Sequence, residues 1–140
     1  MKLHKFLIVL IFIPLMSNNC DNMMEKRYSI KVENNTNQFI YTTVGCSKFN
    51  MNSYPDTTLP SIKPSLIKVS PNDYNYLDHS FKWEEVIANL PSDTLSIYIF
   101  DATTIDEMGW HQVEEGYEVL KRYDLSVYDL TQMNWTITYP

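Results

Sequence analysis

Asp93-Thr94-Leu95-Ser96-Ile97-Tyr98-Ile99-Phe100-Asp101 is the stretch of sequence that decides the fold. From Leu95 to Phe100 nearly every position is apolar, and an aspartate closes each end. A strand with one face in water alternates polar and apolar residues, whereas this stretch offers apolar groups to both faces. It therefore predicts the central strand of a sheet, with a layer of structure on each side. Nothing in it indicates a reaction.

A helix is predicted on either side of this strand. Before it, Ser80 can cap a helix that runs to Asn89 and stops at Pro91, with Trp83 facing the core. The apolar residues of this helix repeat at helical spacing: Trp83, Val86, Ile87 and Leu90. After the strand, Thr104-Ile-Asp-Glu107 has the spacing of a capping box, which predicts a helix that ends at Gly116. Its apolar residues are Ile105, Met108 and Val113.

The N-terminal half of the domain is predicted to form strands and loops. Residues 28–33 alternate apolar and polar side chains, residues 34–37 favour a turn, and residues 39–44 are rich in strand formers. These two runs are predicted to pair as a hairpin. Residues 46–65 contain three prolines and predict a long irregular loop, and residues 66–70 predict a short strand stopped by Pro71-Asn72-Asp73.

The C-terminal quarter holds one ambiguous segment. In residues 117–125, Tyr117, Val119 and Tyr123 alternate as in a strand, although Tyr117 also continues a helical repeat; a strand is favoured after Gly116. Ser126, with Asp129 at the box position, predicts a short helix through Met133, and residues 135–139 predict a last half-buried strand. The fold class expected is α+β: a mainly antiparallel sheet or β-sandwich-like core of about six strands, with two or three short helices. Residues 27–140 are expected to form a single globular domain.

Residues 1–19 have the pattern of a secretory signal peptide. Lys2 and Lys5 precede an apolar run of 11 residues, Phe6–Met16, which is too short to span a hydrocarbon core of about 30 Å. The run ends just before Cys20, where a bacterial lipoprotein is cleaved and acylated with a fatty acid such as palmitate. Asn19 departs from the usual pattern, which has a small residue before the cysteine. The alternative is cleavage by the general signal peptidase, which would leave Cys20 as a free thiol. Residues 20–26 would form the tether of the lipid anchor.

Composition limits the partners and the chemistry. Hydrophobic residues make up 44% of the chain, which is enough for a core. The formal charge of -6 becomes -8 when Lys2 and Lys5 leave with the leader, so nucleic-acid binding is not expected. If Cys20 carries lipid, Cys46 has no disulfide partner; if Cys20 is free, a Cys20–Cys46 bridge could add about 3 kcal/mol. Cys46 is expected to be buried and inert.

No catalytic or metal-binding motif stands out, so no enzyme activity and no cofactor are expected. His79 and His111 lie far apart and outside any zinc-ligand spacing. Asp101 and Asp106 could contribute to a calcium site, but the Asp-rich loop pattern is missing. The paired acids are interpreted as solvated helix faces: Glu84-Glu85, Asp106-Glu107 and Glu114-Glu115.

Aromatic residues are the most informative candidates for recognition. Tyr54, Tyr74 and Tyr76 fall in segments predicted to be loops, where binding residues gather, and exposed tyrosines can stack on sugar rings. The alternative is that these rings cover the core.

Four sequence blocks resemble a family of small Bacteroidota lipoproteins: Tyr54–Pro60, Leu90–Phe100, Leu120–Ser126 and Asn134–Pro140. The resemblance covers most of the mature chain and implies a cell-envelope location, without implying an activity. The outer membrane is expected rather than the inner. Asp56-Thr57-Thr58 also resembles the acceptor of Bacteroidota O-glycosylation, at Thr57. The expected function is a lipid-anchored, non-enzymatic binding or accessory module with a protein or glycan partner. The alternatives are a structural subunit of an envelope assembly and, third, a glycan-acting enzyme.

Overall fold

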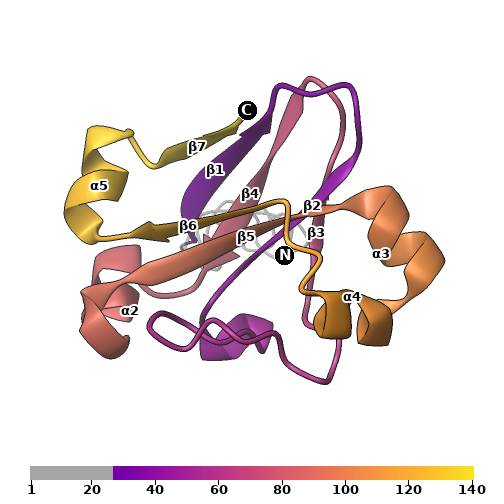
Figure 1. Cartoon of the computed structure of the whole chain (residues 1–140). Helices are drawn as coiled ribbons and strands as arrows, with labels where there is room; N and C mark the ends of the chain where they lie inside the picture. The colour runs from indigo at the N-terminus through magenta and orange to yellow at the C-terminus, as the bar shows by residue number, and fades with distance from the viewer. Residues whose placement is uncertain (1–26) are drawn as a thin grey trace, which may run out of the picture.

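Two β-sheets pack face to face in the computed structural model, which describes residues 27–140 (Figure 1). The predicted leader and Cys20 lie outside these residues. Sheet A has three strands in the order β4 (Asp73–His79), β1 (Tyr28–Asn34) and β7 (Thr136–Tyr139). Sheet B has four strands in the order β3 (Ile67–Val69), β2 (Ile40–Val44), β5 (Leu95–Asp101) and β6 (Lys121–Leu125). All neighbours are antiparallel except β1 and β7, so the predicted α+β class is confirmed.

Strand β5 is central, as the sequence predicted. It pairs with β2 on one side and β6 on the other, and every side chain from Leu95 to Phe100 is buried. Leu95, Ile97 and Ile99 point into the core between the two sheets. Tyr98 and Phe100 point the other way, into a smaller outer core with Met51, Leu59, Ile105, Trp110 and Val113. Strand β5 is therefore apolar on both faces because each face packs against a core of its own.

The predicted hairpin of the first two strands is wrong, because β1 and β2 belong to different sheets. The turn between them is held by the buried side chain of Asn34, whose amide donates to the carbonyls of Gln38 at 2.7 Å and Ser70 at 3.0 Å. Its Oδ1 accepts the backbone N–H of Thr36 at 3.1 Å. These bonds bend the chain from sheet A to sheet B, and the connection from β3 to β4 crosses back beside them. Strand β1 therefore pairs with β4, and β2 pairs with β3.

Helices α2 (Trp83–Ala88) and α5 (Val127–Gln132) pack together over one end of the two sheets (Figure 1). Trp83 is 1% exposed, as its helical spacing predicted, and its ring N–H donates to the carbonyl of Tyr28 at 3.1 Å. Ser80 does not cap α2, because the helix begins later and its N-cap is Lys82, which makes no side-chain capping bond. The capping box of Ser126 and Asp129 on α5 is confirmed in both directions.

Helices α3 (Ala102–Met108) and α4 (Trp110–Gly116) replace the one long helix predicted after β5. They are separated by Gly109, whose φ of 81° and ψ of 160° break the helical path. Asp101, and not Thr104, is the N-cap of α3, because its carboxylate accepts the backbone N–H of Thr104 at 2.7 Å. Met108 is 45% exposed and does not join the core.

The proline-containing loop from residue 46 to residue 66 covers the outer face of sheet B next to α3 and α4. It begins with a 3-10 turn, η2 (Ser47–Phe49), and a second 3-10 turn, η3 (Pro91–Asp93), joins α2 to β5. Met51 and Leu59 are the buried apolar residues of this loop in the outer core. None of the helices within residues 27–140 has the length and apolar character needed to cross a bilayer.

Candidate functional site

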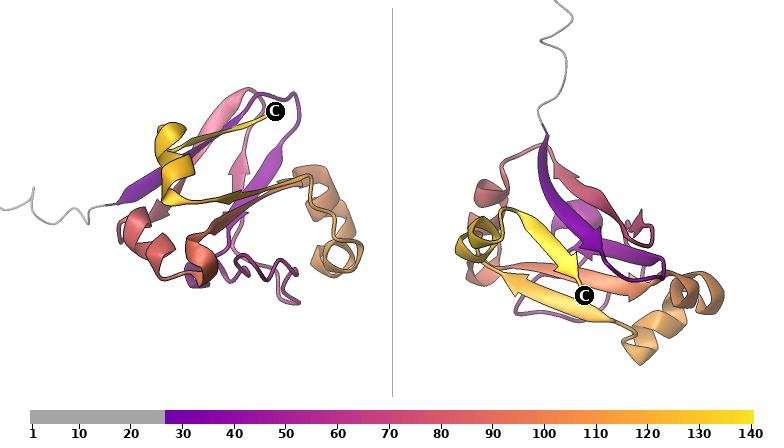
Figure 2. Two further views of the ribbon diagram at one scale, coloured as in Figure 1. Left: turned by 60° about the vertical axis from the view of Figure 1, so that its left-hand side comes forward. Right: turned by 90° about the horizontal axis from the view of Figure 1, so that it is seen from above.

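The outer face of sheet A carries a row of polar and aromatic side chains. In the register of β1 and β4, Lys31 lies opposite Tyr76 and Glu33 lies opposite Tyr74. Their neighbours Ile30, Val32 and Leu77 point inward and are fully buried. Seen from above, Figure 2 shows β1 and β7 lying over sheet B with no helix in front of them. The outer face of sheet A, formed by the following residues, is therefore open: Ser29, Lys31, Glu33, Tyr74, Tyr76, Asp78, Thr136 and Thr138.

Tyr74 and Tyr76 form an exposed aromatic pair on this face. They were predicted to lie in a loop, but they belong to the edge strand β4. Their ring centroids are 5.6 Å apart at an interplanar angle of 73°, an edge-to-face contact that fixes one ring against the other. The rings keep 49% and 43% of their surface exposed. Large apolar groups held this open at a fixed geometry are typical of recognition surfaces.

Lys31 and Glu33 flank the aromatic pair. The ammonium of Lys31 lies 2.6 Å from a carboxylate oxygen of Glu33 and 4.2 Å from the centroid of the Tyr74 ring. The hydrogen bond to Glu33 raises the pKa of Lys31, and the same bond holds the pKa of the Glu33 carboxyl below its usual range. Glu33 is thus ionised at neutral pH, and the two opposite charges offset each other beside the rings.

A polar hollow of about 230 Å³ adjoins Tyr74 at the end of the sheet. Its lining consists of Glu33, Asn35, Asn72, Asp73 and Tyr74. One carboxylate oxygen of Asp73 accepts the backbone N–H of Tyr74 at 2.8 Å, and the Asn72 amide donates to Asn37 at 3.2 Å. The side-chain amide of Asn35 makes no hydrogen bond with any residue from 27 to 140. The polar hollow therefore keeps both donors and acceptors available to a ligand.

Tyr54 lies away from this pair. It is 39% exposed and belongs to the loop on the outer face of sheet B, where its backbone N–H donates to the Ser96 hydroxyl at 3.1 Å. The structure thus brings Tyr74 and Tyr76 together and places Tyr54 on the opposite side of the two sheets. Thr57 is half-buried in the same loop as Tyr54, and its O-glycosylation stays a prediction. The neighbouring Asp56 carboxylate accepts the Thr58 hydroxyl at 2.8 Å, and this bond lowers the pKa of Asp56.

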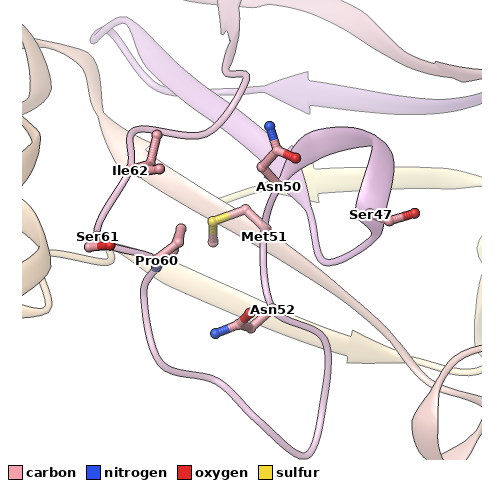
Figure 3. A pocket seen from close by; sticks show the side chains of 7 residues that line it. All are labelled: Ser47, Asn50, Met51, Asn52, Pro60, Ser61 and Ile62. Carbon is pink, nitrogen blue, oxygen red and sulfur yellow. The ribbon is translucent and has the colours of Figure 1, made fainter.

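A second hollow, the Met51 hollow, opens within that loop and measures about 530 Å³ (Figure 3). Met51 is 5% exposed, and its side chain lies between the two limbs of the loop. The amide of Asn52 already donates to the carbonyl of Thr58 at 3.1 Å and to its hydroxyl at 3.0 Å. These contacts maintain the shape of the loop. The residues that line the Met51 hollow are Ser47, Asn50, Met51, Asn52, Pro60, Ser61 and Ile62.

The cysteine and histidine side chains that could act in catalysis are dispersed within residues 27–140. Cys46 is buried, as expected, and burial raises the pKa of its thiol, so it is a poor nucleophile. Burial lowers the pKa of His79, whose Nδ1 accepts the Phe81 backbone N–H at 3.1 Å. His111 is exposed on α4 beside Glu114 and Glu115.

The carboxylates considered for calcium do not converge either. Asp101 caps α3, and Asp106 accepts the hydroxyl of Tyr41 at 3.1 Å. Within residues 27–140, no three His, Cys, Asp or Glu side chains lie close enough to hold a metal ion. The paired acids Glu84-Glu85 are exposed on α2, in agreement with a solvated helix face.

Sequence reasoning did not identify five residues of this site: Lys31, Glu33, Asn35, Asn72 and Asp73. The alternation of residues 28–33 already indicated that Lys31 and Glu33 face outward. It could not show that Tyr74 and Tyr76 lie beside them, because the pairing of β1 with β4 joins segments about 45 residues apart. Comparisons with protein-family models, with curated proteins and with solved structures found no match.

Proposed function

We propose that this protein is a lipid-anchored module of the cell envelope that binds a neutral glycan on the outer face of sheet A. The observation that supports this best is the exposed Tyr74–Tyr76 pair next to a hollow lined by carboxylates and amides. Aromatic rings offer a flat apolar surface to the C–H groups of a sugar. Carboxylate and amide groups at the edge of such a surface bind its hydroxyls.

The size and the charge of the site limit the class of ligand that can bind there. A hollow of about 230 Å³ is smaller than the usual site for a drug-sized ligand and suits one sugar ring of a longer chain. The positive charge of Lys31 is offset by its contact with Glu33. The negative charge of Asp73 therefore remains uncompensated in the hollow. An acidic sugar would be repelled there, whereas the hydroxyls of a neutral sugar can donate to these oxygens.

The electrostatics of Glu33 do not suit the acid of a glycosidase. A glycosidase needs one carboxylic acid whose pKa is raised so that it can protonate the leaving oxygen. The contact with Lys31 lowers the pKa of Glu33 and keeps it ionised.

The anchor is proposed from the leader and Cys20, and labelling with radioactive palmitate tests it. Incorporation should disappear in Cys20→Ser, and incorporation that persists in this variant would refute the anchor.

A glycan array tests the proposed binding. Wild-type protein should bind neutral glycans, and Tyr74→Ala and Tyr76→Ala should each weaken binding about tenfold or more, since each removes a central contact ring. Tyr54→Ala is the matched control, because it removes a tyrosine of similar exposure from the opposite side of the protein and should leave binding unchanged. No binding of the wild type to any glycan, together with a protein partner recovered by crosslinking in the envelope, would favour the alternative of a structural subunit.

A further inference from the structure

The polypeptide enters the domain at the end covered by α2 and α5. Tyr28, the first residue of β1, pairs with His79, and its carbonyl accepts the ring N–H of Trp83 from α2. Strand β1 then runs away from this end and reaches Asn34 beside the polar hollow, a distance of about 20 Å for seven extended residues. The two views in Figure 2 place the start of β1 next to the helical end. The entry point and the proposed glycan site thus lie at opposite ends of sheet A.

Two strongly exposed aromatic side chains lie at this helical end. Phe81, just before α2, is 65% exposed, and Tyr128 on α5 is 71% exposed; no other aromatic side chain among residues 27–140 is as exposed. Phe81 and Val86 also line a shallow hollow of about 270 Å³ on α2. Neither ring packs against either hydrophobic core of the protein. The helices next to these rings, α2 and α5, contact each other. Aromatic side chains in this setting favour the interface between a bilayer and water.

The charges at this end are mixed. Arg27, Lys48 and Lys82 are exposed there, and the Lys48 ammonium donates to the carbonyl of Asp78 at 2.8 Å. The carboxylates of this end are Glu84 and Glu85 on α2, Asp93 in η3, Asp129 on α5, and Asp78 opposite Ser29. Three cations against five carboxylates give no net attraction to anionic lipid. The aromatic rings would therefore supply most of the contact with a membrane.

The covalent distance from the proposed anchor favours such a contact. Seven peptide steps separate Cys20 from Arg27, so the tether reaches at most about 25 Å. A lipid at Cys20 would hold the helical end near the bilayer at a high effective concentration, and a weak contact would then suffice to orient the domain.

We propose that Phe81 and Tyr128 dock the helical end of the domain onto the lipid surface and direct the polar hollow of sheet A away from the membrane. The inference rests on the lipid anchor proposed above. It is independent of which glycan is bound.

Thiol labelling of the full-length chain in a bacterial host with a lipoprotein pathway tests this orientation. Single replacements Phe81→Cys and Tyr128→Cys are compared with the control Thr138→Cys, which is exposed on the outer face of sheet A. Native Cys46 is 5% exposed and sets the background, which is measured on the unmodified chain. Each variant is labelled with a hydrophilic maleimide in open membrane fragments and again after solubilisation in detergent.

Docking predicts that positions 81 and 128 react about fivefold or more slowly in membranes than in detergent, whereas position 138 reacts equally fast in both. Membrane-bound protein that reacts equally fast at all three positions overturns the docking and leaves the anchor intact. Protection at position 138 also overturns it, because another face would then contact the lipid. Protein that remains in the soluble fraction with Cys20 present overturns the anchor, and the docking with it.

Discussion

Replacing Gly45 by alanine should destabilise the protein through the long loop on sheet B. Gly45 follows the last residue of β2, and its backbone N–H donates to the carbonyl of Ser96 at 2.7 Å. A Cβ at this position would lie 2.4 Å from the carbonyl oxygen of Asn52 and 2.9 Å from the Cα of Ser53. Both neighbours are backbone atoms, so neither can rotate away. The limb of the loop that carries Asn52 and Ser53 would have to move.

The cost follows from what that limb holds in place. Overpacking a fixed site usually costs about 1–3 kcal/mol. Moving the limb also weakens the bond from the Tyr54 backbone N–H to the Ser96 hydroxyl, which contributes about 1 kcal/mol. We therefore expect Gly45→Ala to lower the free energy of unfolding by about 2–4 kcal/mol. For a domain of this size, the melting temperature should fall by roughly 8–16 °C.

Urea unfolding followed by tryptophan fluorescence measures this effect, and Gly116→Ala is the matched control. A Cβ on Gly116 would meet the side-chain oxygen of Glu118 at 2.8 Å, and that flexible side chain can turn aside. Because alanine favours a helix over glycine by up to about 1 kcal/mol, the control should be neutral or slightly stabilising. If both variants unfold at the wild-type midpoint, the loop does not pack against Gly45 as described.

Three further changes test the core and its buried groups. Trp83→Ala removes a fully buried ring and should cost about 3–5 kcal/mol in urea unfolding; a cost below about 1 kcal/mol would contradict the packing of α2. Thr42→Val should stabilise the protein by about 1 kcal/mol, because the buried Thr42 hydroxyl has no hydrogen-bond partner among the described residues; a destabilised variant would reveal a missing partner. Burial raises the pKa of Tyr98 to about 12, so the unfolded state loses this proton at a lower pH than the folded state does. The free energy of unfolding should therefore fall by about 2–3 kcal/mol between pH 10 and pH 12. Tyr98→Phe should lose less over that range in a pH series of unfolding curves, and an equal loss would assign the effect to other groups.

The elements that sequence predicted correctly are those whose signals are local. The unbroken apolar run from Leu95 to Phe100 required burial on both faces, and β5 has it. Ser126 and Asp129 form the predicted capping box because such a box involves only residues within one turn. The prediction failed at Thr104, where the same spacing occurs, because Asp101 lies three residues earlier and caps the helix first.

The candidate site could be predicted only in part, because it depends on strand pairing. Strand β4 was missed since only Leu77 of its seven residues is buried, and an edge strand with one covered face shows little apolar alternation. Tyr74 and Tyr76 were identified as ligand-facing from their residue type, but their placement in a loop was wrong. Grouping them with Tyr54 also failed, because the turn at Asn34 sends the chain to the other sheet.

The proposed glycan site is tested most directly by mapping amide chemical shifts of the isotope-labelled protein during titration with a neutral glycan that it binds. Binding on the outer face of sheet A predicts perturbations at Glu33, Asn35 and residues 73–76, with residues 47–62 unchanged. Perturbations confined to residues 47–62 would place the ligand in the Met51 hollow and contradict the account.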